Sequence, residues 1–198
     1  ILGYDIAARI GLATNLNPHM HPHGTWGVIG AASAIGVLNR LDRQKIIELI
    51  NISSNFSLTT SRKTMLEGGT VRNSYTGISS QMAHLAHQIL QAGFSGEKDG
   101  IDSVFGNIVS SGFDTAAALD ELGTRFEVTR NYFKLHACCR YNHAALDALW
   151  LLMEQYSELQ NPENIAHIDV ESYFLAAELT DPKPVSYTHL TLPTMYTV

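Results

Sequence analysis

One segment of the chain places three histidines, His19, His21 and His23, at alternate positions before Gly24. Imidazole nitrogens are common metal ligands, but a metal site needs further ligands, and no H-E-x-x-H motif supplies them. The segment also precedes a predicted helix, whose free N–H groups and dipole favour an anion. A neutral histidine there could take up or release a proton near neutral pH. Metal binding, acid–base chemistry at an anion site and a solvated turn all remain open.

A second segment, GGTVRNSY at residues 68–75, combines two glycines with Arg72 ahead of a long predicted helix. A guanidinium at that place could bind a carboxylate through two parallel hydrogen bonds. The GxxxxGK[ST] pattern of a Walker loop is absent, so the segment does not indicate a nucleoside triphosphate site. Taken alone, it is more typical of a flexible turn with a surface charge.

The third segment starts at Lys134 and reads KLHACCRYNH, between a predicted strand and a predicted helix. Lys134 and Arg140 offer carboxylate binding, and a desolvated lysine can transfer protons. His143 lies at the start of the following helix. The adjacent Cys138 and Cys139 have two interpretations. One of them could act as a nucleophile together with a histidine, or both could simply be small buried residues.

Together the three segments supply several cations and histidines, with few acids nearby in the sequence. Such a set suits a small di- or tricarboxylate, because cations neutralise carboxylates. A histidine or lysine could then remove a proton α to a carboxylate while the developing enolate is stabilised electrostatically. Loss of water or of CO₂ would follow without a metal. We therefore expect His21, Arg72 and Lys134 to meet in one pocket.

The composition narrows the class of protein. The chain has 198 residues, with 13 Lys and Arg against 19 Asp and Glu, a formal net charge of −6. An acidic chain is not expected to bind nucleic acid or a membrane surface. With 45% hydrophobic and 16% charged residues, it is too apolar for a disordered chain. The two cysteines form no disulfide framework, and no apolar run reaches the ~20 residues of a membrane span, so we expect a cytoplasmic protein.

Hydrophobic spacing predicts that most of the chain is helical, and the clearest amphipathic stripe runs over residues 78–90. We expect Gly93 to end that helix and Asp114 to cap a later one. Helices are predicted at residues 3–13, 26–38, 43–51, 78–90, 114–122 and 145–156.

Strand signals are confined to the last third of the chain, at residues 126–133 and 165–175, where apolar and polar residues alternate. The predicted fold class is mainly α: an all-helical domain at residues 1–124, followed by part of a smaller α+β lid domain at residues 125–184. The tail, residues 185–198, carries no charged side chain, and its VSYTHLTLPT resembles the translation of a sequencing adapter. We expect that tail to be non-native and exclude it from the fold prediction.

At the same three segments the chain resembles the MmgE/PrpD family, which includes 2-methylcitrate dehydratases and cis-aconitate decarboxylases. The matching stretches are HPHGTWGVIGAASA, GGTVRNSYTGISSQMAHLAHQILQAGFSGE and KLHACCRYNHAALDAL. The resemblance implies a helical domain with a smaller α+β lid, an active site between them, no cofactor and a homodimer. Because family members are more than twice as long, it also implies a piece truncated at both ends, which we expect to be inactive alone.

The resemblance further implies roles for individual residues. His21 falls on the family's active-site histidine, Lys134 on an active-site lysine and His143 on the histidine that opens the next helix. Arg72 falls where many members carry lysine, a change that keeps the charge and alters its geometry. The predicted catalytic residues are His21, Lys134 and His143; the predicted substrate-binding residues are Arg72, Lys134, Arg140 and His23; no metal ligand is predicted.

The predicted function is that of a cofactor-independent lyase, a dehydratase or a decarboxylase, acting on a small di- or tricarboxylate such as 2-methylcitrate or cis-aconitate. One alternative is a metal-dependent hydrolase centred on His19, His21 and His23, which would hold a stoichiometric ion. Another is a non-catalytic helical binding module. The sequence leaves open which acid is the substrate and whether water or CO₂ departs.

Overall fold

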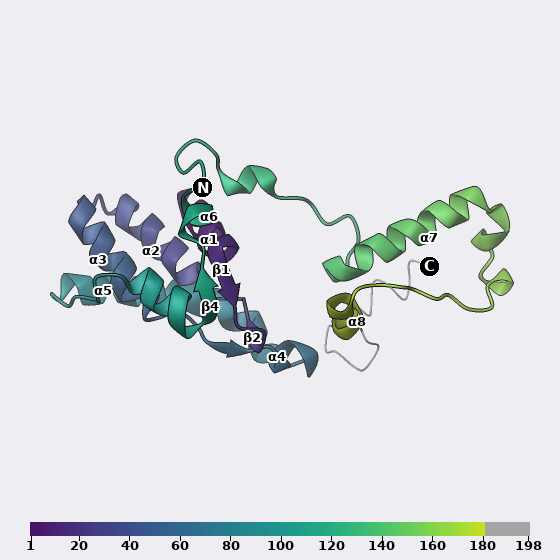
Figure 1. Cartoon of the computed structure of the whole chain (residues 1–198), viewed down its shortest axis with the longest axis horizontal. Coiled ribbons are helices and arrows are strands. Elements are labelled where there is room, and N and C mark those ends of the chain that lie inside the picture. Colours follow the sequence, from purple (N-terminus) through teal and green to yellow (C-terminus); the bar gives the residue numbers. More distant parts are fainter. Residues whose placement is uncertain (181–198) are drawn as a thin grey trace. The chain divides into compact units, whose positions relative to one another are not determined.

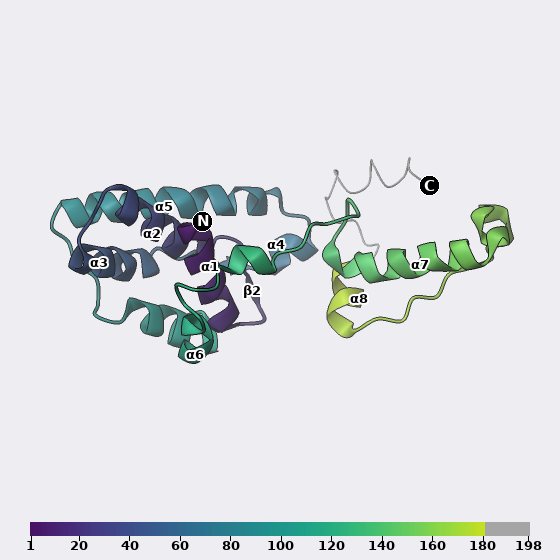
Figure 2. The same cartoon turned by 90° about the horizontal axis from the view of Figure 1, so that it is seen from above.

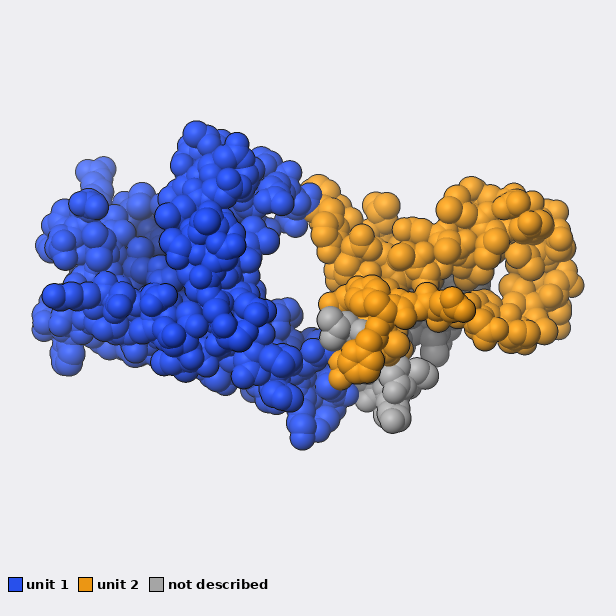
Figure 3. Space-filling model, viewed as in Figure 1, with its two compact units in different colours: residues 1–131 blue, residues 132–198 orange. Residues whose placement is uncertain are grey.

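The computed structural model describes residues 1–180, which fall into two compact units, Ile1–Asn131 and the residues from Tyr132 onward (Figure 3). The fold is mainly α, as predicted: within the described residues the strands form only two short, two-stranded sheets. No helix in this part of the chain has the length and apolar character needed to cross a membrane.

The first unit holds most of the helices and both sheets (Figures 1 and 2). Its helices are α1 (Leu2–Ala13), α2 (Gly27–Leu38), α3 (Arg43–Ser54), α4 (Lys63–Leu66), α5 (Tyr75–Gln91) and α6 (Thr115–Leu119). Its antiparallel strand pairs are β1 (Thr14–Leu16) with β4 (Ser110–Phe113), and β2 (Met20–His21) with β3 (Thr60–Ser61). Its short helical turns are η1 (Thr70–Ser74), η2 (Asp102–Ile108) and η3 (Glu127–Arg130).

Helix α2 lies at the centre of this unit and packs against α1, α3 and α5 (Figures 1 and 2). Its Val28, Ile29 and Ala32 are fully buried, which explains why the helix carries no charged residue. Where α1 meets α2 the two backbones touch, because a Cβ on Gly30 would lie 2.2 Å from the carbonyl oxygen of Gly3. Any side chain at Gly30 would push the helices apart.

The predicted helices of this unit are present. The stripe over residues 78–90 belongs to α5, whose Ala83 and Ala86 are fully buried, and Gly93 follows that helix with a φ of +86°, as expected of a residue that ends a helix. The predicted cap of α6 is confirmed too, because the side chain of Asp114 accepts a hydrogen bond from the N–H of Ala117 at 3.0 Å.

Helix α6 ends at Leu119, short of the predicted end at residue 122. Arg9 of α1 explains the early stop, because its guanidinium donates to the carbonyl oxygen of Asp120 at 2.7 Å. The chain then turns through Glu121, which has a φ of +49°. The buried Arg9 side chain therefore binds a backbone carbonyl group beyond Leu119, where the prediction placed a further helical turn.

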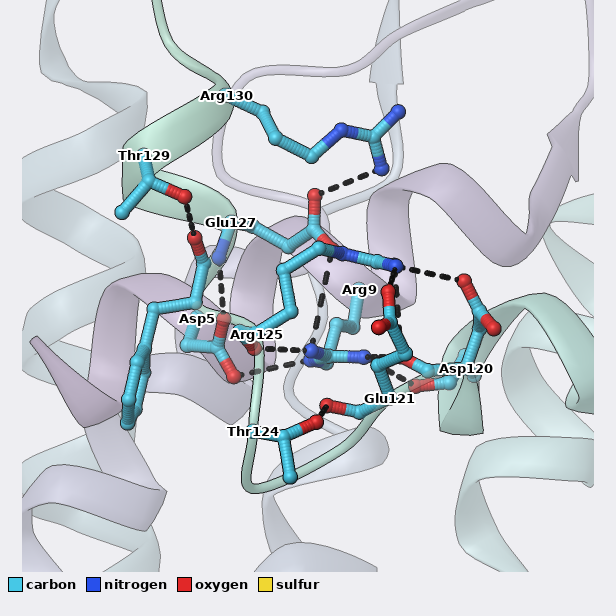
Figure 4. A network of polar contacts seen from close by, with 11 residues as sticks. Asp5, Arg9, Asp120, Glu121, Thr124, Arg125, Glu127, Thr129 and Arg130 are labelled. Atoms are coloured by element: carbon cyan, nitrogen blue, oxygen red, sulfur yellow. Dashed lines mark hydrogen bonds and ion pairs between the residues drawn. The ribbon is translucent and has the colours of Figure 1, made fainter.

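The strand predicted over residues 126–133 is wrong, and the polar network of Figure 4 gives the reason. The N–H of Glu127, the first residue of η3, donates to Oδ1 of Asp5 at 2.7 Å. The carboxylate of Glu127 is only 4% exposed, pairs with Arg130 at 3.2 Å and lies 3.8 Å from Arg9. Paired charges hold this segment in a turn, and apolar–polar alternation cannot reveal them.

Asp5 and Arg9 form the buried centre of this network, with each side chain 3% exposed and Nε of Arg9 lying 2.9 Å from Oδ2 of Asp5. Burial acts to raise the pKa of Asp5, but the hydrogen bonds from the Glu127 N–H and from Arg9 outweigh it, so the pKa is lowered. The network joins residues 120–130 to α1, so residues 125–131 pack within the first unit. The predicted domain bounds stay a prediction.

The second unit is helical in its described part. Its elements are η4 (Arg140–Asn142), α7 (His143–Gln155), η5 (Ser157–Gln160), η6 (Pro162–Asn164) and α8 (Phe174–Thr180). Helix α7 confirms the helix predicted over residues 145–156, with its start slightly earlier.

The strand predicted over residues 165–175 is also wrong, because residues 165–173 have no regular structure and α8 follows them. Residues 132–180 contain no strand with which it could pair, and a lone strand would leave its backbone N–H and C=O groups unpaired. The end of the predicted lid domain, residues 181–184, and the predicted non-native tail, residues 185–198, lie outside the described residues.

Candidate active site

The histidine segment of the first unit begins with a short stretch of sheet that positions His21. Strand β2 pairs His21 with Thr60 of β3. The carbonyl oxygen of His21 accepts hydrogen bonds from Oγ1 of Thr60 at 3.2 Å and from Oγ1 of Thr25 at 3.3 Å. The backbone of His21 is therefore held from both sides, by a strand and by the turn that follows.

That turn is tight, and it brings the segment against the start of α5. The N–H of Thr25 donates to the carbonyl oxygen of Pro22 at 3.2 Å, and Gly24 has a φ of +83°. A Cβ on Gly24 would lie 2.8 Å from the carbonyl oxygen of Tyr75, the first residue of α5. Only glycine combines this backbone conformation with so close an approach.

The ring of His21 is buried, with 2% of the residue exposed. It lies edge-on to the ring of His23, with centroids 4.2 Å apart, and 6.0 Å from the ring of Tyr75. Nδ1 of His21 accepts a hydrogen bond from the N–H of His23 at 3.2 Å. The ring is thus oriented by the backbone of its own turn as well as by its neighbours.

Arg72 gives this cluster its positive charge. It lies in η1, just before α5, after a turn in which the N–H of Gly69 donates to the carbonyl oxygen of Thr64 at 2.7 Å. Burial, then His23, then Arg72 lower the pKa of His21 to about 4. Desolvation and then Arg72 also lower the pKa of His23. At neutral pH both imidazoles are therefore uncharged beside a guanidinium, an arrangement that an anionic ligand would stabilise.

Sequence reasoning identified His21, His23 and Arg72, and the structure brings these three together in the first unit. It did not identify Tyr75, which is 7% exposed and whose hydroxyl lies 3.5 Å from Oγ1 of Thr64. The available signal was an aromatic residue shortly before the predicted long helix, because a residue there lies beside the preceding loop.

The third segment lies in the second unit, where His136 and His143 come together. Their rings are edge-on, with centroids 5.0 Å apart. His143 is 5% exposed, and its Nε2 is buried without a hydrogen-bond partner among the described residues. Nε2 of His136 lies 2.7 Å from Oδ1 of Asp147, which is one turn after His143 in α7. Neither His136 nor Asp147 was predicted as a site residue.

Lys134 and Arg140 are held differently from each other. Nζ of Lys134 donates to the carbonyl oxygen of Cys138 at 3.3 Å. The guanidinium of Arg140 lies 4.8 Å from the centre of the Tyr132 ring and lines a cavity of about 880 Å³. The α7 residues of that cavity, Ala144, Ala145, Ala148, Leu149 and Leu152, lie on the face opposite His143 and Asp147.

The thiol of Cys138, one of the two adjacent cysteines in this segment, is not activated. Cys138 is buried, and desolvation, followed by the neighbouring Cys139, raises the pKa of its thiol. A nucleophilic cysteine requires the opposite shift, since the thiolate is the reactive form. The structure therefore gives no support to a cysteine–histidine nucleophile at Cys138.

The metal hydrolase alternative needs His19, His21 and His23 to converge. His19 is exposed, whereas His21 is buried, and residues 1–180 contain no group of three or more His, Cys, Asp or Glu side chains that could hold a metal ion. Nδ1 of His21 is also occupied by the N–H of His23. The described residues therefore give no support to this alternative.

The two units each hold one part of the predicted site. His21, His23 and Arg72 belong to the first unit, and Lys134, Arg140 and His143 to the second. That they meet in one pocket stays a prediction.

A comparison with known protein families identifies a match for the first part of the chain. A family model described as the MmgE/PrpD N-terminal domain matches residues 1–116, more than half of the chain. The match includes the histidine turn and Arg72 and ends before the segment that starts at Lys134. No curated protein matches the chain.

Proposed function

The chain belongs to the MmgE/PrpD family, and on that premise we propose that the protein works as a cofactor-independent lyase on a small di- or tricarboxylate. Family membership suggests a dehydratase-like activity. The finer proposal is elimination of water from a substrate such as 2-methylcitrate, with loss of CO₂ from an acid such as cis-aconitate as the alternative outcome. One observation carries it: a buried, uncharged His21 beside His23 and Arg72.

The electrostatics of the first unit support an anionic substrate. A carboxylate bound near Arg72 would neutralise the charge that lowers the pKa of both histidines. Arg72 can hold a carboxylate through two hydrogen bonds, and His23 can supply another donor. We propose that these two residues bind one carboxylate of the substrate, with His21 directed at the reacting part of the molecule.

The second unit would supply the remaining groups. We propose Lys134 and His143 for proton transfer, and Lys134 and Arg140 for binding a further carboxylate. Removal of a proton α to a carboxylate produces an enolate, which cationic and N–H groups stabilise in a site that excludes water. The β-hydroxyl group then takes a proton from Lys134 or His143 and leaves as water, which completes a dehydration. We further propose a cytoplasmic homodimer.

The test is an assay of the full-length gene product with 2-methylcitrate and with cis-aconitate, in buffer treated with a chelator. We expect turnover, followed by ultraviolet absorbance of the C=C bond, or by CO₂ release if the reaction is a decarboxylation. His21→Ala should lower kcat ~10²-fold or more. The matched control is His19→Ala, because His19 is exposed and lies two residues earlier. No turnover of either acid, or equal effects of the two variants, would reject the proposal.

A further inference from the structure

The His21–Pro22–His23 turn contains a hydrogen bond that limits what the ring of His21 can do. Pro22 has no N–H, so the first backbone donor after His21 is the N–H of His23, and it donates to Nδ1 of His21 at 3.2 Å. The contact resembles the turns in which an Asp or Asn side chain accepts from the N–H two residues later. Here an imidazole nitrogen takes the place of the carboxylate or amide oxygen.

An imidazole nitrogen that accepts a hydrogen bond carries no proton. The neutral ring has one proton, which must then be on Nε2. Its only lone pair in the ring plane is on Nδ1 and is already engaged by the turn. A proton taken up by this ring would be placed on Nδ1, directly opposite the N–H of His23. The turn therefore opposes protonation of His21 and leaves Nε2–H as the group available to a ligand.

We propose that His21 acts as a neutral hydrogen-bond donor through Nε2–H, to a carboxylate or enolate oxygen of the substrate, and does not remove the substrate proton. This inference rests on the proposed function for its catalytic meaning, while the assignment of the proton to Nε2 rests on the geometry alone. The proton that leaves the substrate carbon is then accepted by another group. The backbone of His23 becomes a positioning element for the donor.

The surroundings of the ring agree with this role. Among the described residues none forms a hydrogen bond with Nε2 of His21, so this donor is not used within that part of the chain. Within residues 1–180, the titratable and charged groups that act on or contact the ring are His23, Arg72 and Tyr75, and none of them is a carboxylate that would stabilise an imidazolium. The pKa of His21, lowered to about 4, keeps the ring uncharged at neutral pH. Arg72 supplies the charge, and a neutral imidazole N–H is able to polarise an oxygen beside it.

The first test measures the proton directly, without activity. In the chain labelled with ¹⁵N-histidine, the nitrogen shifts of His21, assigned with His21→Gln, should show Nδ1 unprotonated and Nε2 protonated throughout pH 5–8. The control His23→Ala keeps the backbone N–H and should keep the same tautomer. Tricarballylate, an unreactive tricarboxylate, should shift the Nε2 signal and leave Nδ1 as the acceptor. A proton on Nδ1 in the ligand-free chain, or titration to imidazolium in this range, would overturn the inference.

The second test uses two amides in the full-length gene product. The side-chain NH₂ of Gln falls near the position of Nε2, whereas the shorter Asn amide reaches only the position of Nδ1, so only His21→Gln preserves the proposed donor. The Asn oxygen can still accept the N–H of His23, which maintains the turn. We expect His21→Gln to retain a kcat about tenfold or more above that of His21→Asn. A smaller difference, or the reverse order, would overturn the donor role. Absence of turnover in the unmodified protein would instead reject the proposed function, while the tautomer measurement still decides where the proton lies.

Discussion

The main-chain N–H of Glu127 donates to Oδ1 of Asp5 at 2.7 Å and so joins residues 122 positions apart in the chain. The same carboxylate binds Arg9 through its second oxygen, and Arg9 reaches the carbonyl oxygens of Asp120 and Arg125 (Figure 4). One buried ion pair therefore fastens the last segment of the first unit to its first helix. Its removal should affect the whole unit, because each member leaves buried polar partners behind.

Arg9→Met should lower the free energy of unfolding by about 3–5 kcal/mol, because it leaves the carboxylates of Asp5 and Glu127 buried without their central cation. The matched control is Arg130→Met, since Arg130 contacts Glu127 but its side chain is 57% exposed. The control should lose less than about 1 kcal/mol. Denaturant unfolding measures both, and an equal loss would contradict the structural role of Arg9.

The lowered pKa of Asp5 predicts how stability responds to acid. A carboxyl group whose pKa is lower in the folded state contributes stability above its ordinary pKa of 3.8, and this stability is lost as the pH falls through the folded value. Asp5→Asn should therefore be less stable than the unsubstituted protein at neutral pH, with the difference shrinking as the pH falls below 3.8. Unfolding free energies at several pH values measure this, and a difference independent of pH would contradict it.

Gly30→Ala should destabilise the first unit, because the new Cβ would lie 2.2 Å from the carbonyl oxygen of Gly3 and 2.7 Å from Cβ of Ala7. We expect a loss of about 1–3 kcal/mol, typical of overpacking in a core. Gly77→Ala is the control, since nothing lies within 4 Å of a Cβ there and the residue is inside α5. The control should gain about 0.5–1 kcal/mol from helix propensity. Thermal unfolding of the two variants should thus give shifts of opposite sign.

Arg72→Gln should raise the pKa of His21 above its value of about 4, because it removes one of the positive charges that lower it. The same change should weaken binding of tricarballylate by about tenfold, the equivalent of one lost charge-assisted interaction. Arg72→Lys keeps the charge and should leave the pKa of His21 lowered. Histidine NMR titration measures the pKa, and calorimetry the affinity. An unchanged pKa in Arg72→Gln would show that this charge does not act on the ring.

Local signals in the sequence were enough for the longer helices, although they missed the short α4 and α8. The spacing of apolar residues in α5, the capping Asp114 and the terminating Gly93 act within one or two turns, so they can be read without knowing the fold. The close approach of α1 and α2 was indicated only in part, because a helix rich in glycine and alanine permits contact without identifying the partner.

The strand predictions failed because they depended on partners. Alternation over residues 126–133 and 165–175 favours a strand, but a strand forms only where another pairs with it. The hydrogen bond from the Glu127 N–H to Asp5 and the charge of Arg9, which no local pattern encodes, hold Glu127 in a turn instead.

By itself, the sequence determined the helical class, the family resemblance and the candidate residues His21, His23 and Arg72, because these follow from residue type and short-range spacing. Only the tertiary structure decided that Nδ1 of His21 is engaged by the N–H of His23, that Tyr75 lies beside its ring, and that Arg140 lines a cavity on the face of α7 opposite His143. The physical reason is that hydrogen-bond direction, burial and the electrostatic influence of a neighbouring charge depend on distances through space. Those distances are fixed only when the helices, turns and buried ion pairs pack together in the folded chain.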